Sequence, residues 1–216
     1  MKKLLLFLSL AALLVIGVGI SPKSAVPTVA AEGATQQTVQ VYTTPDAFQL
    51  GSPVPGAYAT LVRNKTGITT NLHTTAPAGA YTLWWVVFND PANECTSPDD
   101  MYPCEYDIPD IIVWAAGGIN ETDGLLNLSG TLKVDDHSPA QVICPNPDIF
   151  DFCPGPGLTN PSGAVVQVVL RYEGPVTPGL AYEQTRNFFG PGCGINPDGS
   201  EFGPCFDPQL SYPFIP

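Results

Sequence analysis

The chain has few basic side chains. In 216 residues, 8 Lys and Arg stand against 20 Asp and Glu, for a net charge of −12. A surface of this sign repels nucleic acid and anionic lipid headgroups. We therefore expect no nucleic-acid partner, and an extracellular ligand or surface of unknown chemistry as the binding partner.

Catalytic motifs are also missing. The sequence has no G-x-S-x-G, no H-E-x-x-H and no phosphate-binding glycine loop. Its two histidines, His73 and His137, are expected to be hydrogen-bonded structural residues. A shared transition-metal site would require both to reach one ion.

The N-terminus has the anatomy of a secretory signal peptide. Lys2 and Lys3 precede an uncharged apolar run over residues 4–20, and a small-residue stretch ends at Ala31. This pattern predicts cleavage after Ala31 and a secreted or extracytoplasmic protein with no membrane span in the mature chain. An uncleaved N-terminal anchor is the alternative, because the run is close to the shortest length that crosses a bilayer.

After this leader, no stretch has the pattern of a long helix, and 24 Pro and 21 Gly divide the chain into short apolar runs. The most apolar run is YTLWWVVF at residues 81–88, which turn residues close at both ends. Period-two alternation places Trp84 and Trp85 on opposite faces. We expect a central strand that is covered on both sides, with both tryptophans in the core.

The remaining runs predict an all-β fold, a single-domain β-sandwich of about seven or eight antiparallel strands with a β-barrel as the alternative. Gly130 is expected to break or bulge one strand. The other strands are expected at residues 39–42, 57–63, 68–74, 111–116, 125–134 and 163–172, and one helical turn at 180–186. The expected boundaries are a signal peptide over 1–31, a lead-in with a possible edge strand over 32–56, and a β-domain with an irregular C-terminal tail over 57–216.

Six cysteines follow the leader as three close pairs, each within one loop rich in Pro, Gly and Asp. Pairing of nearest neighbours closes the smallest loops at the lowest entropic cost. The expected disulfides are Cys95–Cys104, Cys144–Cys153 and Cys193–Cys205. Thiolate metal ligation is disfavoured because no C-x2-4-C spacing occurs.

The loop around the first cysteine pair carries seven acidic residues between positions 90 and 110. Carboxylate oxygens are hard ligands that suit Ca²⁺. The calcium candidates are Asp99, Asp100, Glu105 and Asp107, and a solvated acidic loop is the alternative. Smaller acidic groups at residues 120–123 and 196–201 lack the full EF-hand spacing.

Two features relate to sugars. Sequons for N-glycosylation occur at Asn64, Asn120 and Asn127, and they matter only in a host that modifies such sites. A pair of loop carboxylates could serve a glycosidase, but no pair is distinguished by its sequence context.

Two motifs resemble a group of secreted prokaryotic proteins with no established activity. The first is YTLWWVVFNDP followed by Cys95, and the second is LRYEGPVTPGL followed by Gln184 and a late cysteine pair. The resemblance spans residues 57–207 and implies a signal peptide and an extracytoplasmic location. Members often carry His where this chain has Tyr172 or Glu173, which argues against a metal role there.

The expected function is that of a secreted or cell-surface, non-catalytic β-domain with a structural, matrix or ligand-binding role, assisted by calcium if the acidic loop binds it. The alternative is a secreted carbohydrate-active hydrolase that uses loop carboxylates.

Overall fold

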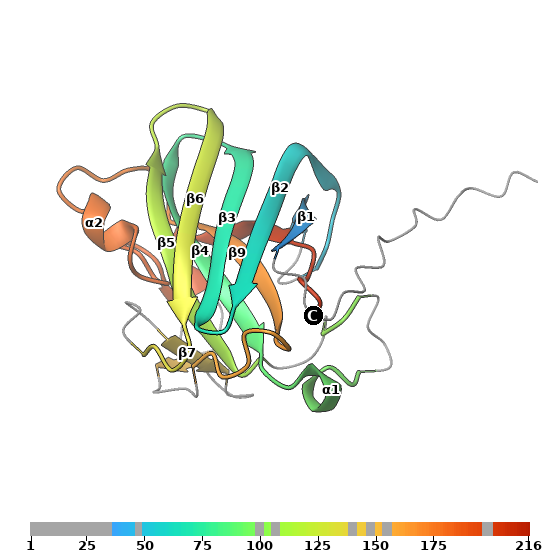
Figure 1. The fold of residues 1–216 in the computed structure, drawn as a ribbon. Helices are drawn as coiled ribbons and strands as arrows, with labels where there is room; N and C mark the ends of the chain where they lie inside the picture. The colour runs from blue at the N-terminus through green and yellow to red at the C-terminus, as the bar shows by residue number, and fades with distance from the viewer. Residues whose placement is uncertain are drawn as a thin grey trace, which may run out of the picture.

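The computed structural model describes residues 36–45, 49–97, 102–104, 109–137, 142–145, 150–152, 157–195 and 201–216 (Figure 1). Its strands are β1 (Gln36–Thr43), β2 (Pro53–Asn64), β3 (Gly67–Ala76), β4 (Gly79–Phe88), β5 (Ile111–Asn120), β6 (Gly124–Lys133), β7 (Val142–Pro145), β8 (Phe150–Phe152), β9 (Val165–Tyr172), β10 (Gly194–Ile195), β11 (Glu201–Phe202) and β12 (Phe206–Ser211). Two single-turn helices, α1 (Pro91–Glu94) and α2 (Ala181–Gln184), accompany them. The predicted leader and its cleavage site lie outside these residues.

Ten of these strands form one antiparallel sheet in the order β6-β3-β2-β1-β12-β9-β4-β5-β7-β8. Figure 1 shows β6, β3 and β2 in front of β4 and β9. The sheet rolls up until β5 packs beside β6, so the eight longer strands enclose a nearly closed barrel. The all-β prediction is confirmed. Sandwich and barrel both fit, because the two halves of one rolled sheet face each other across the core.

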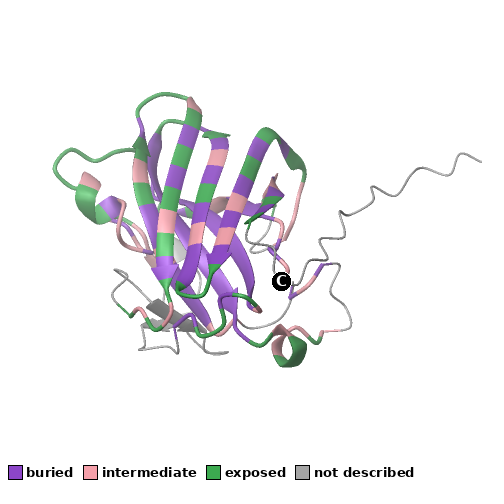
Figure 2. Ribbon diagram, viewed as in Figure 1, coloured by how far each residue is buried: buried purple, intermediate pink, exposed green. Residues whose placement is uncertain are grey.

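Strand β4 lies between β9 and β5, and all ten of its residues are buried (Figure 2). Trp85 belongs to the barrel core, whereas Trp84 packs on the outer face against Phe188. Each indole N–H donates a 2.8 Å hydrogen bond to a threonine hydroxyl, from Trp85 to Thr70 and from Trp84 to Thr82. The expected central strand with two core tryptophans is confirmed.

Strands β2, β3 and β6 have one buried and one exposed face, as their alternating colours in Figure 2 show. Leu61, Ile68 and Leu132 are fully buried in the barrel core. Polar neighbours face solvent, and Thr69 and Thr131 share a hydrogen bond of 3.0 Å between their hydroxyl oxygens. This alternation is the pattern of an antiparallel sheet that is covered on one side only.

Gly130 does not interrupt β6, which corrects the predicted break or bulge. The pairing of β6 with β3 is in register along the whole strand. A Cβ at position 130 would lie 2.4 Å from the carbonyl oxygen of Ala115 on β5. The glycine therefore permits the close approach of β5 and β6 that closes the barrel. The bulge falls in β5 instead, where the register with β4 shifts between Leu83 and Trp84.

The C-terminal segment also differs from its expected irregular form. Strand β12 pairs with β1 on one side and β9 on the other, so β1 is not an edge strand. Pro208 makes a strand hard to predict here, because proline cannot donate a hydrogen bond to a neighbouring strand. It lies where the register with β9 shifts between Phe206 and Gln209, so no ladder hydrogen bond is lost.

Arg63 on β2 joins four segments of the fold. Its side chain is buried, and it donates to the Oε1 atom of Gln37 and to the backbone carbonyls of Pro161, Ala164 and Phe214 at 2.8–3.1 Å. A guanidinium suits this position because its donors point in several fixed directions.

The structure has disulfides Cys95–Cys104 and Cys193–Cys205, two of the three expected pairs. Cys153 lies outside the described residues, so the third pair stays a prediction. The helical turn expected at residues 180–186 is confirmed as α2. None of the helices in the described part of the chain is long and apolar enough to cross a membrane.

Candidate functional site

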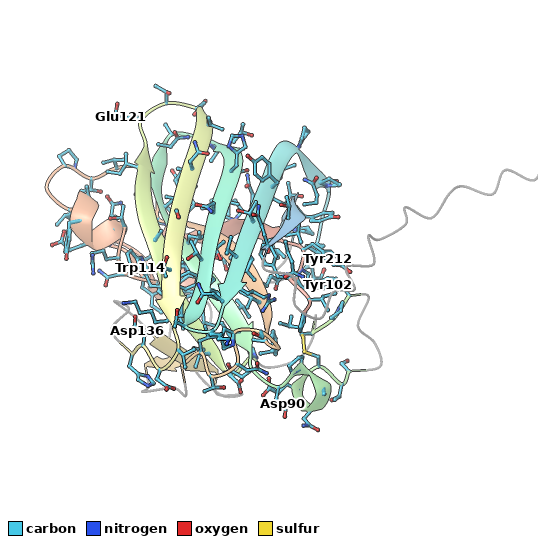
Figure 3. The ribbon with its side chains drawn as sticks, in the orientation of Figure 1. Asp90, Tyr102, Trp114, Glu121, Asp136 and Tyr212 are labelled. Carbon is cyan, nitrogen blue, oxygen red and sulfur yellow. A yellow bond between two sulfur atoms is a disulfide. The ribbon has the colours of Figure 1, made fainter. Side chains whose placement is uncertain are left out.

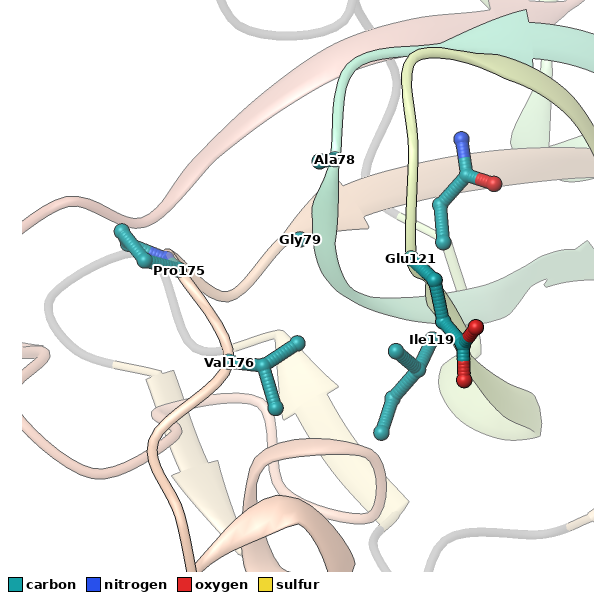
Figure 4. Close-up of a pocket in the computed structure, with 7 residues that line it drawn as sticks. Ala78, Gly79, Ile119, Glu121, Pro175 and Val176 are labelled. Atoms are coloured by element: carbon teal, nitrogen blue, oxygen red, sulfur yellow. The ribbon is translucent and has the colours of Figure 1, made fainter.

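A cavity of about 430 Å³ opens at one end of the barrel (Figure 4). Figure 3 shows Glu121, at its rim, at the opposite end of the molecule from Asp90. The cavity forms where the β3–β4 turn, the β5–β6 turn and the segment after β9 meet. It is lined by Ala78, Gly79, Ile119, Asn120, Glu121, Pro175 and Val176.

Hydrogen bonds hold the two turns together on one side of this cavity. The buried amide of Asn120 donates to the carbonyls of Ala76 and Pro77 at 2.8 and 3.2 Å. The Oδ1 atom of Asp123 accepts from the backbone N–H of Ala78 at 2.8 Å. These two side chains hold the wall in place, and their polar atoms already form hydrogen bonds with the backbone.

Gln184 on α2 holds the opposite wall. Its side chain is buried, and its Nε2 atom donates to the carbonyls of Pro175 and Glu173 at 3.0 and 3.3 Å. Its Oε1 atom accepts from the N–H of Thr177 at 2.8 Å. Thr185, directly after α2, lies close against β5, since a Cβ at Gly117 would lie 1.8 Å from its carbonyl oxygen. These contacts position the wall that Pro175 and Val176 form.

Glu121 differs from its polar neighbours in the cavity. It is exposed and makes no hydrogen bond or ion pair with any residue that the structure describes. Ile119 and Val176 lie beside it and are 40% and 38% exposed. An apolar surface beside one unpaired carboxylate suits an organic cation with an apolar body.

The carboxyl of Glu173 lies buried near this cavity, with several polar partners. The Oε1 atom of Glu173 accepts a 2.6 Å hydrogen bond from the Thr82 hydroxyl, and its Oε2 atom accepts from the N–H of Gly190 at 3.2 Å. Burial raises the pKa of this carboxyl from 4.5 to about 7, against the opposing effect of these hydrogen bonds and of Arg171. The carboxyl therefore gains and loses its proton near neutral pH.

Arg171 lies next to Glu173 on the outer face of β9 and is fully buried. Its Nε atom is 3.8 Å from Oε1 of Glu173 and donates to the carbonyl of Phe188 at 2.8 Å. Its Nη1 atom forms a 2.9 Å ion pair with Asp207, and the guanidinium lies 4.2 Å from the centre of the Phe188 ring. These contacts hold the C-terminal segment over β9.

Glu173, Cys193 and Cys205 are the described residues that come closest to a metal-ligand set, with ligand atoms within 4.8 Å of one another. Both cysteines are joined in a disulfide, however, and a disulfide offers no thiolate ligand. In this state the group is a carboxyl beside a disulfide and not a metal centre.

The four calcium candidates, Asp99, Asp100, Glu105 and Asp107, lie outside the described residues. The three-residue group at the β5–β6 turn is divided, because the side chains of Asn120 and Asp123 bind backbone groups while Glu121 faces the cavity. Calcium binding stays a prediction for the acidic loop.

The two histidines lie at different places on the barrel. His73 stacks on Tyr58, and its Nδ1 atom is 2.8 Å from Oδ1 of Asn127 in the middle of β6. His137 is exposed and lies beyond the end of β6, against Gly157. The extended chain between Asn127 and the end of β6 spans roughly 20 Å. The structure therefore gives His73 the expected hydrogen bond and does not bring the two rings together.

The three sequons have different environments. Asn64 and Asn127 are exposed. Asn120 is 8% exposed, and its amide nitrogen already donates to backbone carbonyls. A glycan on Asn120 is therefore incompatible with this fold.

Sequence reasoning missed Glu173, Arg171 and the cavity. A signal for the first two was available, because two opposite charges stand two residues apart at the end of the apolar run 164–170. Side chains at that spacing share one face of a strand, and a strand buried on both faces forces such charges to pair. The cavity had no such signal, because its walls come from three distant segments.

Comparison with protein-family models, with curated proteins and with solved structures finds no match to this chain.

Proposed function

We propose that this protein is an extracytoplasmic, non-catalytic β-domain that binds a small organic cation in the cavity at the end of the barrel. The observation that carries the proposal is the position of Glu121, a carboxylate that pairs with no described residue and lies beside the exposed apolar side chains of Ile119 and Val176. The negative charge of the whole chain favours the same class of ligand.

The compartment is supported by the disulfides. Two are present in a chain of this size, and disulfides persist mainly in oxidising compartments. This agrees with the leader that the sequence predicts.

The cavity gives no support to the alternative of a glycosidase. Such enzymes need two carboxyl groups about 5–10 Å apart on either side of the sugar bond. Of the described residues that line the cavity, only Glu121 carries a carboxylate.

Titration calorimetry with matched ligands tests the proposal. Hexylammonium, hexanol and hexanoate share an apolar chain and differ in charge. We expect hexylammonium to bind most tightly, by up to about fivefold over hexanol, because an exposed ion pair contributes about 0.2–1 kcal/mol. Glu121→Gln should abolish this preference. Glu183→Gln, which removes an exposed carboxylate outside the cavity, should preserve it.

Equal affinities for hexylammonium and hexanol in the native protein would contradict the proposal, as would a preference that survives Glu121→Gln.

Thermal melting tests the predicted calcium site separately. A calcium site in the acidic loop would raise the melting temperature in millimolar Ca²⁺ and lower it in EDTA. A melting temperature that changes with neither reagent would contradict calcium binding.

A further inference from the structure

The carboxyl of Glu173 lies against a disulfide whose two cysteine residues differ in exposure. Its Oε2 atom lies 3.2 Å from Sγ of Cys205, which is 7% exposed. The partner, Cys193, is half-buried, so this residue is more exposed to solvent than Cys205. The more exposed cysteine of this disulfide is thus bonded to the one whose sulfur faces the carboxyl.

We propose that Cys193–Cys205 is a site of thiol–disulfide exchange, in which Glu173 donates a proton to the sulfur of Cys205 when an external dithiol reduces the bond. The partner is a dithiol reductant, either a small molecule or a protein. This activity is separate from ligand binding in the cavity and does not depend on it.

The reaction takes place in two steps. A thiolate of the reductant attacks Sγ of Cys193, a new S–S bond forms and the Cys193–Cys205 bond breaks. Cys205 leaves with the electron pair and takes the proton of Glu173, which becomes a carboxylate. The second thiol of the reductant, as its thiolate, then attacks its own sulfur in the mixed disulfide and releases Cys193 as a thiolate, which takes a proton from water. Two electrons have passed from the dithiol, now a disulfide, to the protein.

The hydrogen bonds around Glu173 direct its proton toward sulfur. Oε1 accepts from Thr82, whose own oxygen accepts from the indole N–H of Trp84. Oε2 accepts from the N–H of Gly190 and has Cys205 as its other neighbour. A protonated Oε2 atom can therefore donate to Sγ of Cys205.

Among the described residues, the charges that face this carboxyl are Arg171 on β9 and Asp207 on β12, which pairs with Arg171. Thr82 on β4 and the N–H of Gly190 are neutral. Because burial raises the pKa to about 7, a substantial fraction of the carboxyl carries its proton at neutral pH. An ordinary exposed glutamate would be ionised there and could not donate.

The frame around the sulfurs does not depend on the disulfide alone. Strands β10 and β11 pair through Gly194 and Phe202, and the N–H of Cys193 donates to the carbonyl of Gly190 at 2.9 Å. Both thiols can therefore remain close after reduction, so that the bond can form again.

The Cys95–Cys104 bridge provides an internal control. No carboxylate among the described residues forms a hydrogen-bond contact with either of its sulfurs, although acidic residues are numerous nearby. Its reduction should depend on pH only through the thiolate content of the reductant.

Reduction of the oxidised full chain by dithiothreitol tests the proposal. Free thiols are trapped with iodoacetamide, and mass spectrometry of peptides follows each disulfide separately. The rate constant per dithiothreitol thiolate for Cys193–Cys205 should fall as pH rises through about 7, since Glu173 loses its proton there. In Glu173→Gln it should be about a hundredfold lower at pH 6 and independent of pH, at the low end of general-acid catalysis. The constant for Cys95–Cys104 should be unchanged.

A rate constant for Cys193–Cys205 that is independent of pH in the native protein would overturn the proposal, even if Glu173→Gln does not fold. Glutathione provides a second measurement on the native chain. The mixed disulfide should form on Cys193, and its formation mainly on Cys205 would contradict the assigned direction of attack.

Discussion

The hydroxyl of Thr82 on β4 donates a 2.6 Å hydrogen bond to Oε1 of Glu173, and both residues are fully buried. The bond joins the central strand to the segment that follows β9. It holds a titratable carboxyl between the barrel and the C-terminal segment, so the protonation of Glu173 is linked to folding.

The stability of the protein should therefore carry a pH-dependent contribution from Glu173. The folded-state pKa is about 7, whereas the ordinary value of 4.5 applies when the chain is unfolded. The contribution is fully present below pH 4.5 and is lost as pH rises to about 7, because only the unfolded state ionises freely in that window. The difference corresponds to about 3 kcal/mol.

Denaturant unfolding of Glu173→Gln and of the native protein, both oxidised, isolates this contribution. The free energy of unfolding of the variant relative to the native protein should rise by about 3 kcal/mol between pH 4 and pH 8.5. Glu183→Gln, at an exposed position on α2, should show no such trend. A difference that stays constant with pH would show that Glu173 has an ordinary pKa.

Arg63→Met should destabilise the barrel by about 2–4 kcal/mol, because three buried carbonyls lose the hydrogen bonds that the guanidinium donates. The affected groups are the carbonyls of Pro161, Ala164 and Phe214. Lys65→Met, in the exposed β2–β3 turn, is the matched control and should change the free energy of unfolding by less than about 0.5 kcal/mol. Equal effects of the two variants in denaturant unfolding would refute the role assigned to Arg63.

Gly130→Ala tests the closure of the barrel. The added Cβ would meet the carbonyl oxygen of Ala115 at 2.4 Å, so β5 and β6 must separate. We expect a loss of about 1–3 kcal/mol, the usual cost of overpacking. Ser129→Ala alters the neighbouring exposed position and should have little effect. A Gly130→Ala protein as stable as the native one would mean that the two strands do not pack this closely.

The sequence predicted the features that depend on local patterns. Strand β4 could be predicted because eight uncharged residues stand between turn residues. The Cys95–Cys104 disulfide could be predicted because both cysteines lie in one loop. The helical turn at α2 could be predicted because it also forms within one short segment. In each case the residues that decide the structure are neighbours in the chain.

The features that sequence reasoning missed depend on distant segments. Strand β12 is built around Pro208 and is a strand because β1 and β9 flank it. The need for Gly130 is visible only when β5 reaches β6. The raised pKa of Glu173 comes from burial under the C-terminal segment, which its sequence neighbours do not indicate.

The most direct test of the proposed function is to map the binding of hexylammonium by NMR on the isotope-labelled protein. The account predicts that the largest amide shifts fall on residues 78–79, 119–121 and 176, and that Glu121→Gln weakens binding without moving this footprint. Largest shifts on the outer faces of β2 and β3, or no saturable shifts at all, would contradict the assignment of the cavity as the ligand site.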